Sequence, residues 1–153
     1  MRSMGVRPNT SAGAHWVVVQ GTTSNPVLVS SGVIATPKAF DEAQALAHLR
    51  ERLTELIDEH GTDAVVIRGI EPNAKATMRF YPRLRAEGVA LEAAHAAGKE
   101  STLMVWKSIA SLLATRTKKD EYRSADEFRG IETAGWKDEA HDALIAAVAG
   151  LPK

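Results

Sequence analysis

The first third of the chain alternates short apolar runs with turn residues, which is typical of β-strands. The runs cover residues 4–6, 15–19 and 27–34, and polar or glycine-containing stretches separate them. They are rich in Val, a residue that favours strands over helices. Because the connections are short, the sequence predicts three consecutive antiparallel strands.

The period of the apolar positions changes after Phe40. Residues 41–60 place apolar side chains on one side of a helix and charged side chains on the other, and Gly61 is well placed to end this helix. Residues 64–67 are apolar without alternation, as expected of a strand covered on both faces. The apolar stripe of the helix consists of Leu46, Leu49, Leu53, Leu56 and Ile57.

Helix and strand continue to alternate in the second half of the chain. The spacing predicts a helix over residues 81–97, with Leu84 and His95 on its apolar stripe. A strand is predicted at residues 102–106, and a short helix follows at residues 109–113. The strands at residues 64–67 and 102–106 follow the first three, so the predicted sheet has five strands.

Residues 116–135 are the least apolar part of the chain, and basic and acidic side chains are balanced there. This composition predicts a solvated, charged connector. Within it, residues 124–127 have the form of a capping box, which predicts a helical turn that ends near Gly130. A final helix is predicted over residues 136–149; it becomes apolar all round from Ala143, so its second half is expected to be buried.

The predicted order of elements is β-β-β-α-β-α-β-α. An antiparallel unit that continues into β-α-β units gives an α/β fold, with a mixed five-stranded sheet and helices on both faces. The length of 153 residues is that of one ordinary domain. We therefore expect a single domain over residues 1–153.

The composition narrows the classes of function. Lys and Arg number 19, as do Asp and Glu, so the chain is not a globally basic nucleic-acid binder and any site for a polyanion must be a local patch. The absence of cysteine excludes a disulfide scaffold, a thiolate zinc site and cysteine catalysis. No apolar run is long enough for a signal peptide or a membrane span, so we expect a cytoplasmic protein with no membrane partner.

Four segments together match the motifs of one known family. They are Gly-Val-Arg-Pro-Asn-Thr at residues 5–10, Val-Val-Ile-Arg at 65–68, the helix at 84–97, and Asp-Glu-Ala-His-Asp-Ala-Leu at 138–144. With the order of elements, they resemble the ribonuclease H-like superfamily, and within it the RuvC-type Holliday-junction resolvases. The chain also resembles, more closely, small uncharacterised bacterial proteins of this fold that share Val-Val-Ile-Arg and a helix rich in Leu-Glu-Ala-Ala, here residues 91–94.

The acidic residues of that family are only partly present. Two-metal hydrolysis of a phosphodiester needs several carboxylates that converge on two divalent ions about 4 Å apart. Where the resemblance implies the first two acids, this chain has Arg7 and Arg68, which are cations and cannot bind Mg²⁺. Only Glu139 and Asp142 on the last helix remain. The sequence therefore predicts a degenerate active site and no metal site.

Two interpretations of the arginines stay open. In this fold, Arg7 and Arg68 lie at the ends of neighbouring central strands and face Glu139 and Asp142. The four side chains could form a closed, inert ionic cluster. Alternatively, the arginines could bind a phosphate or carboxylate group, because planar guanidinium forks suit such anions.

A basic segment with two aromatic residues precedes and begins the second predicted helix. Lys75, Arg79 and Arg83 could contact the backbone of a nucleic acid. Phe80 and Tyr81 could stack on its bases, or they could instead anchor the start of the helix in the core. In the second case, the basic residues simply face water.

Other candidate features carry weaker signals. The polar turn at residues 10–13 could cradle a phosphate, although it matches no phosphate-binding motif and a simple turn is the alternative. Trp16, Trp106 and Trp136 are expected in the core or at an interface rather than around a ligand.

Three hypotheses of function follow. The first is a domain with a degenerate acidic site that binds nucleic acid or another phosphate-containing ligand near Arg7, Arg68 and the basic segment, without catalysis or a cofactor. The second is a nuclease that acts on DNA or RNA with Mg²⁺ or Mn²⁺, with Glu139, Asp142 and Glu71 as the candidate catalytic residues. The third is a scaffold that works through a homodimer.

Overall fold

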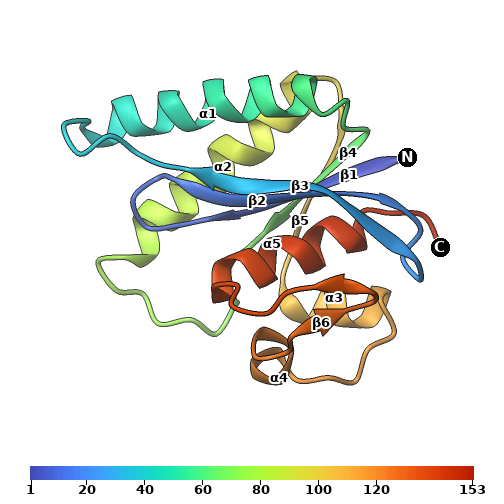
Figure 1. Ribbon diagram of the computed structural model, residues 1–153. Coiled ribbons are helices and arrows are strands. Elements are labelled where there is room, and N and C mark those ends of the chain that lie inside the picture. The colour runs from blue at the N-terminus through green and yellow to red at the C-terminus, as the bar shows by residue number, and fades with distance from the viewer.

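The first three strands form the antiparallel half of the sheet in the computed structural model, which describes residues 1–153 (Figure 1). They are β1 (Arg2–Pro8), β2 (Ala14–Gly21) and β3 (Pro26–Ile34). β1 pairs with β2, and β2 pairs with β3, both in antiparallel register. The predicted run of three antiparallel strands is confirmed.

The parallel half of the sheet extends from the other side of β1. β4 (Ala64–Arg68) pairs in parallel with β1 and with β5 (Glu100–Met104). The order across the sheet is β3-β2-β1-β4-β5, which confirms the predicted mixed sheet of five strands. β1 and β4 are therefore central neighbours that run in the same direction.

Helices cover both faces of this sheet (Figure 1). α1 (Glu42–Glu59) and α2 (Phe80–Ala96) lie on one face, and their core contains Met4 of β1. α5 (Asp138–Ala149) and α3 (Trp106–Leu112) lie on the other face. They cover the strand residues whose side chains point away from α1 and α2. None of the helices is both long enough and apolar enough to cross a membrane.

α1 begins and ends where the sequence predicts. The Asp41 side chain accepts a hydrogen bond from the Gln44 amide at 2.8 Å, and the Gln44 side chain accepts one from the Asp41 amide at 2.9 Å. This reciprocal capping box satisfies amides that the first turn leaves unpaired. Gly61 takes a positive φ of 56° just beyond the helix, a conformation that glycine adopts at little cost.

The predicted apolar stripe of α2 is wrong. Leu84 and His95 are exposed, and the buried face instead consists of small side chains together with one carboxylate. A helix packed against both α1 and the sheet has room for methyl groups at its closest contacts, and the larger Val89 and Leu91 pack only partly buried beside them. The buried residues are Ala86, Glu87, Ala90, Ala93 and Ala94.

Residues 116–135 contain short elements. α4 (Lys119–Arg123) is followed by a hairpin of β6 (Glu127–Phe128) and β7 (Ile131–Glu132). The helical turn predicted to end near Gly130 is wrong: Arg129 and Gly130 both have positive φ, 50° and 85°, as a tight hairpin turn requires. The Glu127 side chain accepts the Gly130 amide hydrogen at 3.1 Å and so stabilises the turn instead of a helix.

α5 lies unusually close to the central strand. A Cβ added to Gly5 would lie 1.9 Å from the Ala143 carbonyl oxygen and 2.4 Å from the Ala147 amide nitrogen. The missing side chain therefore lets the helix backbone rest directly on β1. This contact fixes the position of α5 along the strand.

We expect Gly5→Ala to destabilise the protein, because the added methyl group meets backbone atoms that cannot rotate away. The cost should be at least about 1–3 kcal/mol, or roughly 2–4 °C of melting temperature per kcal/mol in a chain of this size. Gly88→Ala is the matched control: its added Cβ meets nothing within 4 Å, so the change should stabilise α2 by about 0.5–1 kcal/mol. Thermal unfolding of both variants tests this, and equal melting temperatures would contradict it.

Candidate site at the ends of β1 and β4

An ion pair joins the end of β1 to the start of α5. The Arg7 Nε atom lies 3.5 Å from the Asp142 carboxylate, and the two side chains are 15% and 1% exposed. This distance suits an ion pair but is long for a hydrogen bond, and the nitrogen has no hydrogen-bond partner. Arg7 also donates from Nη1 to the Pro8 carbonyl at 2.7 Å.

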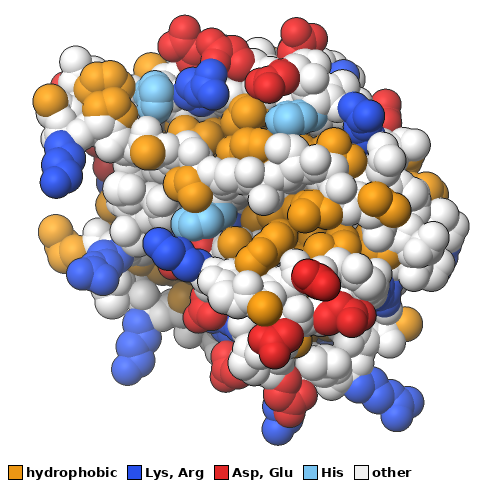
Figure 2. All heavy atoms as spheres, viewed as in Figure 1, with side chains coloured by type: hydrophobic (Ala, Val, Ile, Leu, Met, Phe, Trp, Pro, Cys, Tyr) orange, Lys and Arg blue, Asp and Glu red, His pale blue; other side chains and the backbone are white.

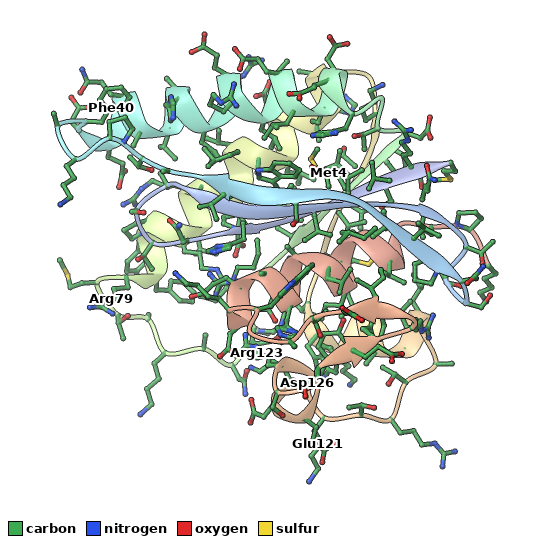
Figure 3. All side chains as sticks on the ribbon, in the orientation of Figure 1. Met4, Phe40, Arg79, Glu121, Arg123 and Asp126 are labelled. Atoms are coloured by element: carbon green, nitrogen blue, oxygen red, sulfur yellow. The ribbon has the colours of Figure 1, made fainter.

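A second arginine holds Asp142 more firmly. Arg123, the last residue of α4, donates from Nε to one carboxylate oxygen at 3.1 Å and from Nη2 to the other at 2.6 Å. Figure 3 places Arg123 between α4 and α5. Asp138 lies 3.9 Å from the same guanidinium group but is well exposed. Both oxygens of Asp142 are thus occupied by one bidentate partner.

Arg68 contacts a local partner rather than the last helix. Its side chain is only 2% exposed and donates to the Gly69 carbonyl and to the Glu71 carboxylate, each at 2.5 Å. The same Glu71 oxygen also accepts the Trp106 amide hydrogen at 3.2 Å. The loop after β4 therefore folds back and neutralises the arginine that ends the strand.

Arg83 forms a further ion pair of the site. It lies 3.1 Å from Glu87 within α2, and it also donates to the Arg68 carbonyl at 3.3 Å. Glu87 accepts the Ile70 amide hydrogen at 2.7 Å. This pair ties the start of α2 to the end of β4.

Burial and charge shift the pKa values of these groups. Burial lowers the pKa of Arg83 to about 10, and the positive charges of Arg7 and Arg68 act in the same direction. Burial also lowers the pKa of Arg7. For Asp142, burial opposes ionisation, but the hydrogen bonds and charge of Arg123 outweigh it, with help from Arg68 and Arg7, and hold the pKa below its ordinary value. These groups are therefore charged at neutral pH.

The remaining predicted site residues do not join the ion pairs around Asp142. Glu139 makes no ion pair, although its charge acts on Arg7. Lys75 and Arg79 are exposed on the loop before α2 and also make no ion pair. Tyr81 is 54% exposed, so the alternative that it anchors the start of α2 in the core is wrong for this residue; it packs against Phe80 with ring centroids 5.5 Å apart.

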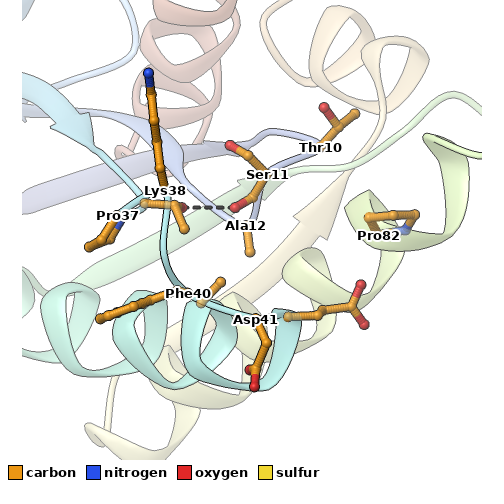
Figure 4. Close-up of a pocket in the computed structure, with 11 residues that line it drawn as sticks. Thr10, Ser11, Ala12, Pro37, Lys38, Phe40, Asp41 and Pro82 are labelled. Carbon is orange, nitrogen blue, oxygen red and sulfur yellow. Dashed lines mark hydrogen bonds between the residues drawn. The ribbon is translucent and has the colours of Figure 1, made fainter.

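The turn at residues 10–13 is closed by its own side chains. The Asn9 side-chain oxygen accepts hydrogen bonds from the Ser11 and Gly13 amides, both at 3.0 Å. These amides are therefore not free to cradle a phosphate. The Thr36 hydroxyl donates to the Ser11 carbonyl at 2.8 Å beside a cavity of about 330 Å³ that Phe40 and Pro82 also line (Figure 4).

The candidate catalytic residues do not fit a divalent metal ion. No group of three or more His, Asp or Glu side chains is placed to hold one. Asp142 is bound by two guanidinium groups and Glu71 by a third, so a divalent cation would have to displace buried arginines from both. A two-metal centre needs carboxylates without such partners.

Arg123 and Glu87 are the contacts that sequence reasoning missed. Arg123 lies in the segment predicted to be a charged connector, and nothing near it in the sequence marks Asp142, 19 residues further on, as its partner. The predicted apolar stripe of α2 does not include Glu87, yet its side chain is buried, with 2% exposed. Its spacing of four residues from Arg83 on one helix is a signal that could have indicated the pair.

Known proteins resemble this chain in fold and in sequence. No family model matches it. The structure of Thermus thermophilus RuvC superposes with a TM-score of 0.78 at 20% identity and covers 97% of this chain and 92% of that one. The yeast mitochondrial Holliday junction resolvase Ydc2 superposes with a TM-score of 0.55 at 10% identity, over 96% and 77% of the two chains. Both likenesses confirm the fold.

The sequence comparison identifies the family. The crossover junction endodeoxyribonuclease RuvC of Rubrobacter xylanophilus is 30% identical over 149 residues, which cover 95% of this chain and 82% of that protein. The similarity therefore extends over nearly the whole of this chain. With its ribonuclease H-like fold, this chain belongs to the RuvC family.

Proposed function

We propose that this chain binds nucleic acid, or another phosphate-containing ligand, at Arg7 and the basic residues around it, and that it does so without metal-dependent cleavage. The observation that carries the proposal is the state of Asp142. Its carboxylate accepts two hydrogen bonds from Arg123 and pairs with Arg7. A carboxylate held in this way is already neutralised and has no free oxygen to offer a metal ion.

The balance of charges explains why Arg7 would bind the ligand. Arg68, Arg83 and Arg123 each have a carboxylate of their own: Glu71, Glu87 and Asp142.

Arg7 only shares the partner of Arg123, at a longer distance, and its side chain is 15% exposed. It is thus the guanidinium group with capacity for a further anion, and a phosphate oxygen suits its planar fork. Lys75 and Arg79 are exposed and unpaired, so they supply more distant contacts to a polyanion.

Nucleic acid is the ligand class that the relatives favour. Thermus thermophilus RuvC is described in complex with a Holliday junction substrate, and that structure superposes on this chain with a TM-score of 0.76 at 20% identity. The relative from Rubrobacter xylanophilus is named as an endodeoxyribonuclease. A four-way junction is therefore the first ligand to test, with duplex and single-stranded DNA beside it.

We expect fluorescence anisotropy to detect DNA binding at low salt in the presence of EDTA, and the affinity to fall as salt rises. Arg7→Ala should weaken it about tenfold, since a hydrogen bond to a charged group contributes roughly 1.5–3 kcal/mol. Arg50→Ala is the matched control: Arg50 is an exposed arginine on α1 that pairs with Glu92, and its loss should leave binding unchanged.

The same DNA is then incubated with Mg²⁺ or Mn²⁺ and examined for cleavage. We expect none. Metal-dependent cleavage that disappears in Asp142→Asn would contradict the proposal and support the nuclease with Glu139, Asp142 and Glu71. Absence of any binding at low salt would contradict the other part of the proposal, that the chain binds nucleic acid.

Asp142→Asn should also destabilise the protein and change its pH dependence. Removing one partner of a buried ion pair costs about 3–5 kcal/mol, whereas the exposed Asp138→Asn should cost about 0–1 kcal/mol.

Because the pKa of Asp142 is lowered in the folded protein, its stabilising effect is complete above the ordinary Asp pKa. It is lost as the pH falls from the ordinary value of 3.8 through the lowered value. Denaturant unfolding at several pH values should show that the difference between wild type and Asp142→Asn shrinks as the pH falls; a constant difference would contradict this assignment.

A further inference from the structure

A trough lies next to Arg7 on the face of the sheet that carries α5. It has a volume of about 250 Å³, and its walls come from β2, β3 and the residues that begin α5. Figure 2 shows apolar side chains exposed on this face, with a histidine and basic side chains at one end of them. The lining of the trough includes His15, Val33, Trp136 and Lys137.

The strand register connects the trough to Arg7. Arg7 of β1 is the Cα partner of His15 on β2, and His15 is the partner of Val33 on β3. Directly opposite residues in an antiparallel sheet have Cβ atoms about 4.5–5.5 Å apart on the same face. The three side chains therefore form one row that runs from the guanidinium group to an apolar end.

The walls of the trough offer an aromatic and apolar surface. The Val33 side chain, on β3, is apolar and yet 56% exposed. The Trp136 side chain is half-buried, and its ring packs edge-on against the ring of His141 with centroids 6.1 Å apart. Packing of this kind holds one ring in place while leaving the rest of its surface available for stacking.

Charge is graded along the same row. Burial lowers the pKa of His15, so its imidazole is neutral at neutral pH and makes the middle of the row uncharged. Lys137 is exposed at the rim. Glu139 is the carboxylate that faces this region, since its charge acts on both Arg7 and His15. The row thus has a cationic end and an apolar end.

We propose that this trough binds one unpaired nucleobase, which packs against Trp136 and Val33 while the phosphate of the same nucleotide contacts Arg7. The volume of the trough would hold about eight water molecules at ~30 Å³ each. Each water has one heavy atom, so this number is comparable with the number of heavy atoms in a nucleobase. A base that is paired in a duplex cannot enter, so the trough selects single-stranded or unpaired nucleotides. The inference rests on the proposed function and specifies its ligand.

Two oligonucleotides of equal length test the proposal: oligothymidylate and its abasic counterpart, which keeps the phosphates and lacks the bases. Base stacking contributes about 1–3 kcal/mol per base. Trp136→Ala should therefore weaken oligothymidylate binding roughly fivefold or more and leave the abasic strand unaffected. Trp136→Phe keeps a ring and should restore most of the affinity. A blunt duplex should bind equally to all of these variants.

A surface variant avoids any effect of Trp136 on folding. Val33→Gln changes an exposed side chain in the trough and should weaken oligothymidylate alone. Val27→Gln is its matched control, because Val27 is 50% exposed on the same strand but does not line the trough. Glu139→Gln removes the opposing charge and should strengthen the binding of both strands.

The outcomes separate this inference from the function on which it rests. If wild type binds the abasic strand as tightly as oligothymidylate, or if Trp136→Ala and Val33→Gln leave oligothymidylate binding unchanged, the base site is overturned. Binding of both strands that is weakened by Arg7→Ala would then still support the proposed function. If neither strand binds at low salt, both proposals are overturned.

Discussion

The contact between β1 and α5 determines the geometry of the whole candidate site. Gly5 has no side chain, so the backbone of α5 at Ala143 and Ala147 can rest on the strand. Arg7 lies two residues beyond Gly5 and therefore on the same face of the sheet. Asp142 directly precedes Ala143. The ion pair between Arg7 and Asp142 is thus a consequence of backbone packing, and it would not survive a shift of the helix along the strand.

The two interpretations of the arginines apply to different residues. Arg68, Arg83 and Arg123 are closed into pairs with Glu71, Glu87 and Asp142. An ionic cluster is therefore present, but the prediction that Arg68 and Glu139 belong to it through the last helix is wrong. Isolated guanidinium groups could not be buried at this density, because each would lose its hydration without compensation. Arg7 departs from this pattern, since it contacts a carboxylate that another arginine already satisfies. The cluster therefore holds the framework of the site, and Arg7 is the guanidinium group in it that has no carboxylate of its own.

Local periodicity predicted most of the fold but little of the site. The strands and α1 follow from apolar spacing and caps, because those signals depend on neighbours in the sequence. The alanine face of α2 was missed, since small residues give almost no periodic signal. The family resemblance located Arg7 and Arg68, yet it led us to expect Arg68 opposite the last helix, whereas Glu71 is its partner three residues away. Arg123 meets Asp142 only because residues 116–135 fold back under α5, and no local pattern encodes that path.

The small number of free cations limits what electrostatics alone can contribute to binding. The chain has no net charge, and most arginines near the site are neutralised internally. Each phosphate contact to a single strand changes the salt slope by about 0.7, so a ligand held by Arg7 and a few exposed lysines and arginines would show a shallow slope and a modest affinity. A nucleic acid bound tightly at this site must therefore gain free energy from uncharged contacts. The apolar end of the row from Arg7 to Val33 is the surface beside the site that can provide them.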